Sequence, residues 1–226
     1  MSMKIVAINI GEPITVEYNG KALTTGIFKT PSLEPVFLGK LNFEGDGQAD
    51  LVNHGGEDKA VCAYPYEHYA YWEQAINKDL GSSAFGENLT LQGMVEPDIH
   101  IGDIYQVGEA VVQVSQPRQP CFKIAKKHGV PDLALQVQNT GYTGYYFRVL
   151  QEGWIQPNSE VELIEKDGNQ ISIQFANNIM HHDKSNKEAI QQILAVEALS
   201  DSWRETFMKR LAKMETDPKT QPEETH

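Results

Sequence analysis

The sequence contains little cysteine and no long apolar segment. Its two cysteines, Cys62 and Cys121, do not form the framework of a disulfide-rich protein, which fits a reducing compartment. No apolar run approaches the roughly 20 residues that a transmembrane helix needs. The first residues lead directly into a strand-like pattern and lack the apolar core and cleavage site of a signal peptide. We therefore expect a cytoplasmic protein.

Positive charge is also scarce. The chain has 19 lysines and arginines against 31 aspartates and glutamates, which gives a formal net charge of −12 at pH 7. Nucleic acids and anionic membrane surfaces are bound through a basic footprint, so the composition argues against both as partners of the whole protein. A local cationic pocket is compatible with this overall charge.

Most of the chain alternates apolar and polar residues over short segments. Asn19-Gly20 lies between two such segments and predicts a hairpin, because a type I′ turn needs positive φ at both central positions. Many short strands, glycine turns and few helices predict a mainly β fold, either a barrel or a closed sheet. The expected strands are 4–10, 14–18, 21–25, 60–64, 102–107, 110–115, 145–150, 160–165 and 171–175, with helices over 66–76 and 131–138.

The composition changes after about residue 176. Ser185 and Glu188 match a capping box before an apolar stripe, and Ser200 or Ser202 can cap a further helix beginning near Trp203. The polar end of the chain, with two prolines, is typical of disorder. We therefore expect a β-barrel domain over 1–175, a small helical appendage over 176–215 and a disordered tail over 216–226.

The turn Ser115-Gln-Pro-Arg-Gln-Pro-Cys121 follows one of the predicted strands. Pro117 and Pro120 stiffen it, so that Arg118 and Cys121 are held on a rigid platform. A thiol among cations is a candidate nucleophile or metal ligand, because positive surroundings favour the thiolate. The alternative is a small buried apolar residue, the role of most free cysteines and the one expected for Cys62.

Several loops place cations or bare backbone at the ends of strands. Glycine turns with exposed N–H groups, together with lysine and arginine, can cradle a phosphate. The candidates are Lys29-Thr30, His54-Gly55-Gly56 with Lys59, Gly86-Glu87-Asn88, and Ser115 with Arg118. Taken singly, the lysines are expected to be solvated and His54 to be a structural hydrogen bonder.

Two further kinds of site remain open at this point. Asp46, Gln48 and Asp50 are a candidate metal site, but hard-cation loops carry more carboxylates in a tighter pattern, which favours a hydrogen-bonded turn. A Cys-His catalytic pair is the other, since such partners are distant in sequence. Nothing in the sequence selects one histidine for Cys121 among His54, His68, His100 and His128.

The order of these motifs resembles a MOSC domain, the domain also found at the C-terminus of molybdenum cofactor sulfurases. The resemblance is closest to the YiiM-like branch, in which a three-helix extension follows the barrel, and it covers about residues 1–215. It is carried by Lys29-Thr-Pro31, Gly45-Asp-Gly-Gln-Ala-Asp50, His54-Gly-Gly-Glu-Asp-Lys-Ala-Val61, Phe85-Gly-Glu-Asn-Leu89 and Pro117-Arg-Gln-Pro-Cys-Phe-Lys123.

The resemblance implies a barrel-like fold that binds the molybdenum cofactor, in which a pterin dithiolene bearing a phosphate holds molybdenum. Cys121 matches the cysteine that coordinates molybdenum or carries sulfur in the family, and a soft thiolate suits such a metal. Arg118 would anchor the phosphate or the pterin. Lys29, Thr30, Lys59 and Asn88 would form hydrogen bonds to the cofactor, and His54-Gly55 would approach it closely.

The resemblance also implies a reductase of N-hydroxylated compounds, such as N-hydroxylated purine analogues, with Mo(IV) removing the oxygen of the N–OH group. The sequence has no cysteine cluster for iron–sulfur and no flavin or nicotinamide fingerprint, so electrons would come from an external reductase. One alternative is a carrier of the cofactor or of sulfur without turnover of its own, and another is an interaction scaffold. A homodimer formed through the helical appendage is an open option.

Overall fold

The central feature is a curled sheet of eight strands. The computed structural model describes residues 2–18, 20–50 and 55–216. The sheet pairs its strands antiparallel except for β6 and β7, which are parallel. In order across the sheet these are β12 (Val161–Glu165), β8 (Ile104–Val107), β9 (Ala110–Pro117), β10 (Tyr145–Gln151), β6 (Val61–Pro65), β7 (Leu89–Gln92), β1 (Lys4–Ile10) and β4 (Thr30–Pro31).

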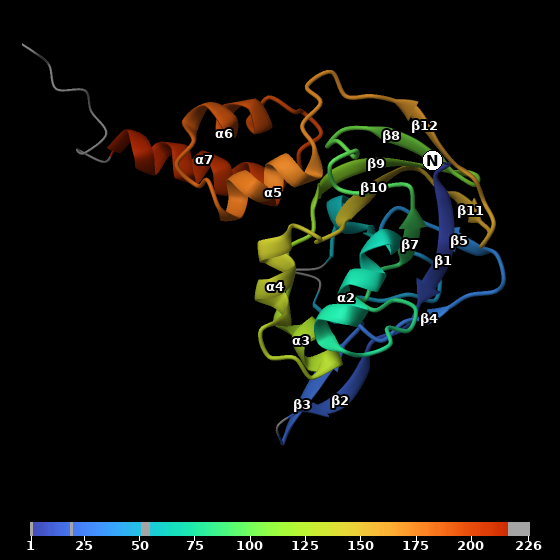
Figure 1. Ribbon diagram of the computed structural model, residues 1–226. Coiled ribbons are helices and arrows are strands. Elements are labelled where there is room, and N and C mark those ends of the chain that lie inside the picture. Colours follow the sequence, from blue (N-terminus) through green and yellow to red (C-terminus); the bar gives the residue numbers. More distant parts are fainter. Residues whose placement is uncertain (1, 19, 51–54, 217–226) are drawn as a thin grey trace, which may run out of the picture.

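The two ends of this sheet approach each other. A bridge joins Lys4 of β1 to Glu160, the residue before β12, so the sheet curls into a barrel-like layer around one apolar core (Figure 1). A smaller pair, β5 (Val36–Leu38) and β11 (Gly153–Ile155), completes the wall. The mainly β, barrel-like fold expected from the sequence is confirmed.

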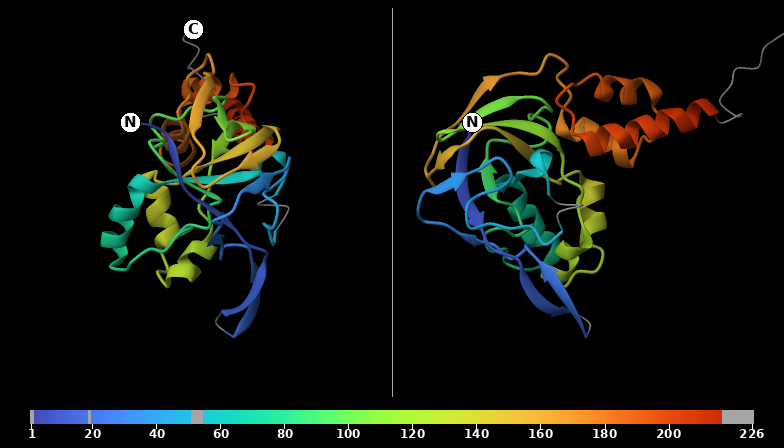
Figure 2. Two further views of the ribbon diagram at one scale, coloured as in Figure 1. Left: turned by 90° about the vertical axis from the view of Figure 1, so that its right-hand side faces the viewer. Right: turned by 180° about the vertical axis from the view of Figure 1, so that it is seen from behind.

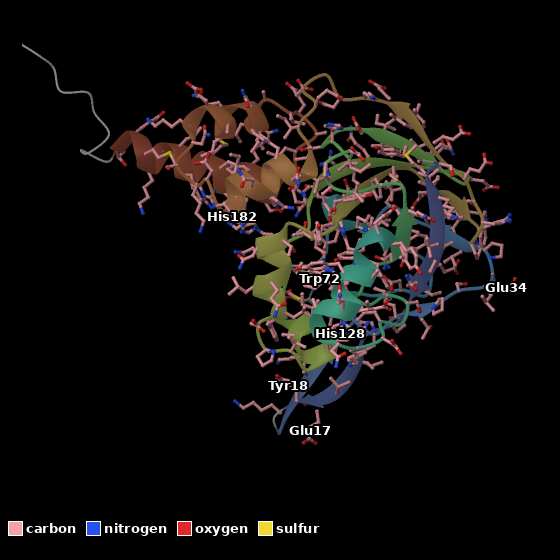
Figure 3. The ribbon with its side chains drawn as sticks, in the orientation of Figure 1. Glu17, Tyr18, Glu34, Trp72, His128 and His182 are labelled. Atoms are coloured by element: carbon pink, nitrogen blue, oxygen red, sulfur yellow. The ribbon has the colours of Figure 1, made fainter. Side chains whose placement is uncertain are left out.

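The predicted hairpin forms with the expected strand bounds. β2 (Ile14–Tyr18) and β3 (Lys21–Thr25) pair antiparallel, with Tyr18 opposite Lys21. Gly20 has φ 72°, as the turn requires, and Asn19 lies outside the described residues. The hairpin projects from the barrel on the side away from the C-terminal helices (Figure 2), and Figure 3 labels Tyr18 near its tip.

A second apolar cluster lies beside the barrel and includes Tyr64, Trp72, Phe85, Ile124 and Leu133. It is formed where the side chain of Phe85 packs among three helices and the adjoining 3-10 turn. These are η2 (Tyr66–His68) with α2 (Tyr69–Ile76), α3 (Phe122–His128) and α4 (Leu133–Thr140). The helices expected over 66–76 and 131–138 are therefore confirmed within a few residues.

The C-terminal segment forms three helices, α5 (Ile173–His181), α6 (Lys187–Leu194) and α7 (Asp201–Thr216), which extend from one end of the barrel (Figure 1). Their buried residues belong to the same apolar core as the barrel, and Phe207 of α7 is fully buried. The helical appendage is confirmed. The proposed boundary at residue 175 stays a prediction, and the expected disordered tail lies outside the described residues beyond Thr216.

Two local predictions in this segment are wrong. The strand expected over 171–175 is limited to a single bridge between Ser172 and His100, and α5 then begins because the Ser172 hydroxyl accepts the N–H of Phe175. The cap of α6 is Asn186, whose side chain accepts the N–H of Ala189, rather than Ser185. In both cases the prediction was wrong about the residue at which the helix begins.

The lengths and compositions of the helices bear on whether one of them could cross a membrane. Within residues 2–18, 20–50 and 55–216, no helix combines the length and the apolar character that a membrane span requires.

The shared core predicts that α7 contributes to the stability of the whole protein. Replacing Phe207 with Ala should lower the free energy of unfolding by ~3–5 kcal/mol, because it leaves a cavity in the core. Met208 is 57% exposed, so Met208→Ala should change stability by less than ~0.5 kcal/mol. Urea denaturation measures both, and equal effects would contradict the assignment of Phe207 to the core.

Candidate functional site

A cavity of about 570 Å³, measured with its open mouth, lies where the loops at one end of the sheet meet. Five of the eight residues predicted to bind the cofactor line it together: Lys29, Lys59, Asn88, Arg118 and Cys121. The other lining residues are Thr25, Gly26, Ile27, Asp46, Gly47, Gln48, Ala49, Cys62, Phe85, Gly86, Lys123 and Tyr146.

Cys121 is delivered by the predicted turn after β9. It adopts an extended conformation (φ −109°, ψ 159°) as the N-cap residue of α3 and is half-buried. The chain enters helix α3 directly after Cys121, and the Cys121 side chain lines the cavity. Cys121 is therefore accessible to a ligand that enters from solvent.

Arg118 is buried, with 7% of its surface exposed. Its Nη2 donates to the carbonyl of Phe85 (2.5 Å), and its backbone N–H donates to the carbonyl of Gly144 (3.0 Å). A guanidinium carries several N–H donors in a planar fork, so the bond to Phe85 leaves others available to an anion in the cavity.

Gly144 makes this arrangement possible. Its φ is +70°, and a Cβ at this position would overlap the carbonyl oxygen of Ala63 on the adjoining strand β6. Glycine alone permits both the positive φ and the close approach. The carbonyl that accepts the N–H of Arg118 is thus placed by a backbone contact that any side chain would prevent.

Two residues of α3 extend the contact made by Arg118. The ammonium of Lys127 donates to the carbonyl of Ser83, and Nε2 of His128 donates to that of Ala84 (2.6 Å). With the bond to Phe85, three successive carbonyls of the 83–85 loop accept from the Cys121 segment. The ring of Phe85 lies between Trp72 and His128, which Figure 3 labels on the helical side of the molecule. We refer to the three hydrogen bonds from Arg118, Lys127 and His128 to the carbonyls of residues 83–85 as the clamp.

Lys29 and Asn88 are engaged with the protein itself. Lys29 forms an ion pair with Asp46, whose second carboxylate oxygen accepts Nδ2 of Asn88 (2.9 Å). The amide oxygen of Asn88 accepts the backbone N–H of Cys62 (3.1 Å). Asp46 also accepts the N–H of Gly11 (2.9 Å), which agrees with the hydrogen-bonded turn favoured over a metal site.

Lys59 ends the short 3-10 helix η1 (Glu57–Lys59) on another wall of the cavity. Burial lowers the pKa of its ammonium, while the charges of Asp58 and Asp50 act in the opposite direction. Desolvation is the larger effect, so an anion that entered the cavity would find a cation that is poorly solvated by water.

Two of the predicted residues that the structure describes do not line the cavity. Thr30 is exposed on the edge strand β4, where it pairs with Ile10, and Gly55 does not line the cavity. His54 lies outside the described residues. Its role, and those of the other candidates towards a cofactor, stay predictions.

Among the lining residues that the sequence did not identify as site candidates are Cys62, Lys123 and Tyr146. Every residue of β6 is buried, so its apolar run gives no sign that one face of Cys62 meets a cavity. Burial raises the pKa of this thiol to about 11, although Arg118 acts against the shift. Lys123 could have been found from its place two residues after Cys121 in the resemblance motif.

The ionisable groups of the wall are mostly cationic. Lys59, Arg118 and Lys123 join the Lys29–Asp46 pair, so the described wall carries a positive excess within an acidic chain. No group of three or more His, Cys, Asp or Glu side chains in the described part of the chain is arranged to hold a metal ion. The positive excess of the wall therefore suits an anionic ligand.

The two cysteines should differ in reactivity. In the native protein at pH 8, iodoacetamide should label Cys121 and leave Cys62 unmodified, because Cys62 is buried and only about one in a thousand of its thiols is ionised. Peptide mass spectrometry after brief exposure measures the two sites separately. Equal labelling of both in folded protein would contradict this geometry, and unfolded protein provides the control.

Lys127 should make stability depend on pH. Burial lowers its pKa to about 8, so between pH 8 and 10.5 the unfolded chain binds more protons than the folded one and stability contributed by this group rises with pH. The free energy of unfolding of the native sequence should therefore increase relative to Lys127→Met from pH 7.5 to 9.5. Urea denaturation at both pH values measures it, and a difference that is constant with pH would refute it.

Comparisons with known proteins agree with the architecture. The MOSC domain family matches residues 50–162, and the YiiM-like, 3-alpha helix domain matches residues 171–213. YflK of Bacillus subtilis (strain 168) is 56% identical over 206 residues, which are 91% of this chain and 93% of YflK. The crystal structure of YiiM from Geobacillus stearothermophilus shares 48% identity with a TM-score of 0.80, over 92% of this chain and 99% of that one.

A more distant relative is much longer. A protein named reductase from Gibberella moniliformis (strain M3125 / FGSC 7600) is 36% identical over 151 residues, which are 65% of this chain but 27% of that protein. The family matches, together with the barrel, the Cys121 turn and the three C-terminal helices, decide the classification. The chain belongs to the MOSC domain family, in the YiiM-like branch that carries a three-helix domain after the barrel.

Proposed function

We propose that this protein is a molybdenum cofactor-dependent reductase of N-hydroxylated compounds, for example N-hydroxylated purine analogues. The observation that carries the proposal is a single cavity in which the Cys121 thiol lies among cations, inside a protein of net charge −12. Membership of the MOSC domain family supports the choice of cofactor.

The residues of the cavity fit such a group. A thiolate is a soft ligand of the kind that a thiophilic metal prefers, and Cys121 is half-buried at the wall. Lys59, Lys123 and Arg118 provide charge for the phosphate, and Phe85 and Tyr146 provide apolar surface for a pterin ring. When bound, the cofactor would supply the two-electron chemistry that removes oxygen from an N–OH group.

The chain itself would bind and orient. Cys121 would hold the metal, and Arg118 would anchor the phosphate. The clamp fixes the turn that carries both residues, so their positions in the wall would be set before the cofactor binds. Cys62 is buried, and burial raises the pKa of its thiol to about 11, so the half-buried Cys121 is the better candidate ligand.

Electrons would come from an external reductase. The Gibberella relative is named reductase, and about three quarters of it lies outside the matching segment, which leaves room there for further domains. We infer that a separate protein supplies the electrons to this chain. The cytoplasmic location and the oligomeric state stay predictions.

Replacing Cys121 with Ala tests the proposal. Protein expressed in a cofactor-competent host should contain molybdenum and pterin by metal analysis and pterin fluorescence. With an artificial reductant, the loaded protein should reduce an N-hydroxylated base, and Cys121→Ala should lose at least about 100-fold in rate as well as molybdenum content. Met208→Ala, whose side chain is exposed away from the cavity, is the matched control.

The possible results separate the candidate functions. Full reduction by a molybdenum-replete Cys121→Ala protein would refute Cys121 as the ligand. Loaded native protein without turnover would instead indicate a carrier of the cofactor or of sulfur. Purified protein without molybdenum or pterin would contradict both and leave an interaction scaffold.

A further inference from the structure

The first turn of α7 contacts the segment that carries Lys59. The backbone N–H of Asp201 donates to Oδ2 of Asp58 (3.1 Å), the residue before Lys59. The other carboxylate oxygen of Asp58 accepts from Nε (3.0 Å) and Nη2 (2.5 Å) of Arg148 on β10. Asp58 is thus held between the sheet and the helix, which leaves Lys59 little freedom to move along the wall.

The same turn contacts the strand that leads to Arg118. The backbone N–H of Ser200 donates to the carbonyl of Ser115 (3.1 Å), and the hydroxyl of Ser202 donates to Oε1 of Gln116 (3.2 Å). Ser115, Gln116 and Ser200 are all buried, with 0%, 2% and 0% of their surfaces exposed. Only Pro117, which is conformationally restricted, separates Gln116 from Arg118.

A third contact joins the two segments to each other. The hydroxyl of Ser115 donates its one proton to the carbonyl of Asp58 (2.5 Å) and also lies 3.1 Å from the carbonyl of Tyr146, which itself lines the cavity. Residues 58, 115 and 200–202 therefore form one hydrogen-bonded unit directly behind the wall. Buried hydrogen bonds hold their geometry firmly, because breaking one leaves a donor or an acceptor without a partner.

The helices do not form the cavity wall itself. All lining residues described above precede the C-terminal helices in the chain, and the last of them is Tyr146. The helices extend from the end of the barrel (Figure 2), and they contribute none of the described lining residues. A role in binding would have to be exerted through the residues that α7 holds.

We propose that the first turn of α7, residues 200–202, is a positioning element that sets the places of Lys59 and Arg118 in the anion-binding wall. The three-helix domain is then part of the binding apparatus. The inference rests on the proposed function, because it concerns the same cavity and assumes that the cavity binds an anion. Asp201 acts through its backbone N–H, since its side chain is exposed.

A matched pair of substitutions isolates that N–H. Asp201→Pro removes the donor at the first helical position, where proline is well accepted, and Asp201→Asn keeps it. Both remove the same charge from the first turn. With inorganic phosphate as the probe, isothermal titration calorimetry at pH 7 and low salt should show affinity lowered about 10-fold in Asp201→Pro and within about twofold of the native protein in Asp201→Asn.

Two further variants separate positioning from general destabilisation. Ser202→Ala removes the bond to Gln116 and the long contact with the Ser200 hydroxyl (3.4 Å), leaves the Asp201 N–H in place, and should weaken phosphate binding by a smaller factor of about 3. Phe207→Ala loses core packing in the same helix without touching the positioning turn, so it should bind phosphate like the native protein at 25 °C while unfolding at lower urea. A purely structural role of α7 would instead make phosphate affinity follow stability.

The results distinguish this inference from the function on which it rests. Equal phosphate affinity in Asp201→Pro and Asp201→Asn, with a native protein whose binding is weakened by Lys59→Ala, would overturn the positioning role and leave the anion site intact. Native protein that does not bind phosphate, or binds it unchanged in Lys59→Ala, would overturn both.

Discussion

The site depends on hydrogen bonds from one short segment to three successive carbonyls of another. Arg118, Lys127 and His128 bind Phe85, Ser83 and Ala84, so the turn that carries the thiol is fixed to a loop more than thirty positions earlier in the chain. A hydrogen bond contributes ~1 kcal/mol, and ~1.5–3 kcal/mol when its donor is charged, as the guanidinium of Arg118 is. The clamp therefore fixes the 83–85 loop relative to the turn that carries Cys121. Residues from both segments line the cavity, so the clamp also sets the width of the cavity between them.

The wall of the cavity is cationic although the chain as a whole is acidic. Lys29 forms an ion pair with Asp46, which offsets its charge. Lys59, Arg118 and Lys123 are the other cations of the described wall. Under the proposed function these oriented donors would recognise an anion, while the large negative charge elsewhere would discourage non-specific binding to nucleic acid or anionic surfaces.

The sequence predicted most strands and brought five site residues together through one ordered set of motifs. Local signals sufficed where the pattern was unambiguous, as in the Asn19-Gly20 hairpin. They failed where two structures share a pattern: Ile171 and Ile173 alternate like a strand, yet the Ser172 cap starts a helix between them. Cys62 could not be identified, because a strand buried on both faces looks the same whether its neighbour is core or cavity. The contacts of α7 join residues more than eighty positions apart and have no local signature.

Gly144 has a consequence for how the sequence can vary. It touches no ligand-binding side chain, yet a methyl group there would force β6 and β10 apart and displace the carbonyl that holds the backbone of Arg118. In a library of random substitutions, this position should be as intolerant as Cys121 itself. A map of mutational tolerance would then show two kinds of intolerant residue around one cavity. Some line the cavity with their side chains, and others, such as Gly144, are intolerant because any side chain would disturb the backbone that positions the lining residues.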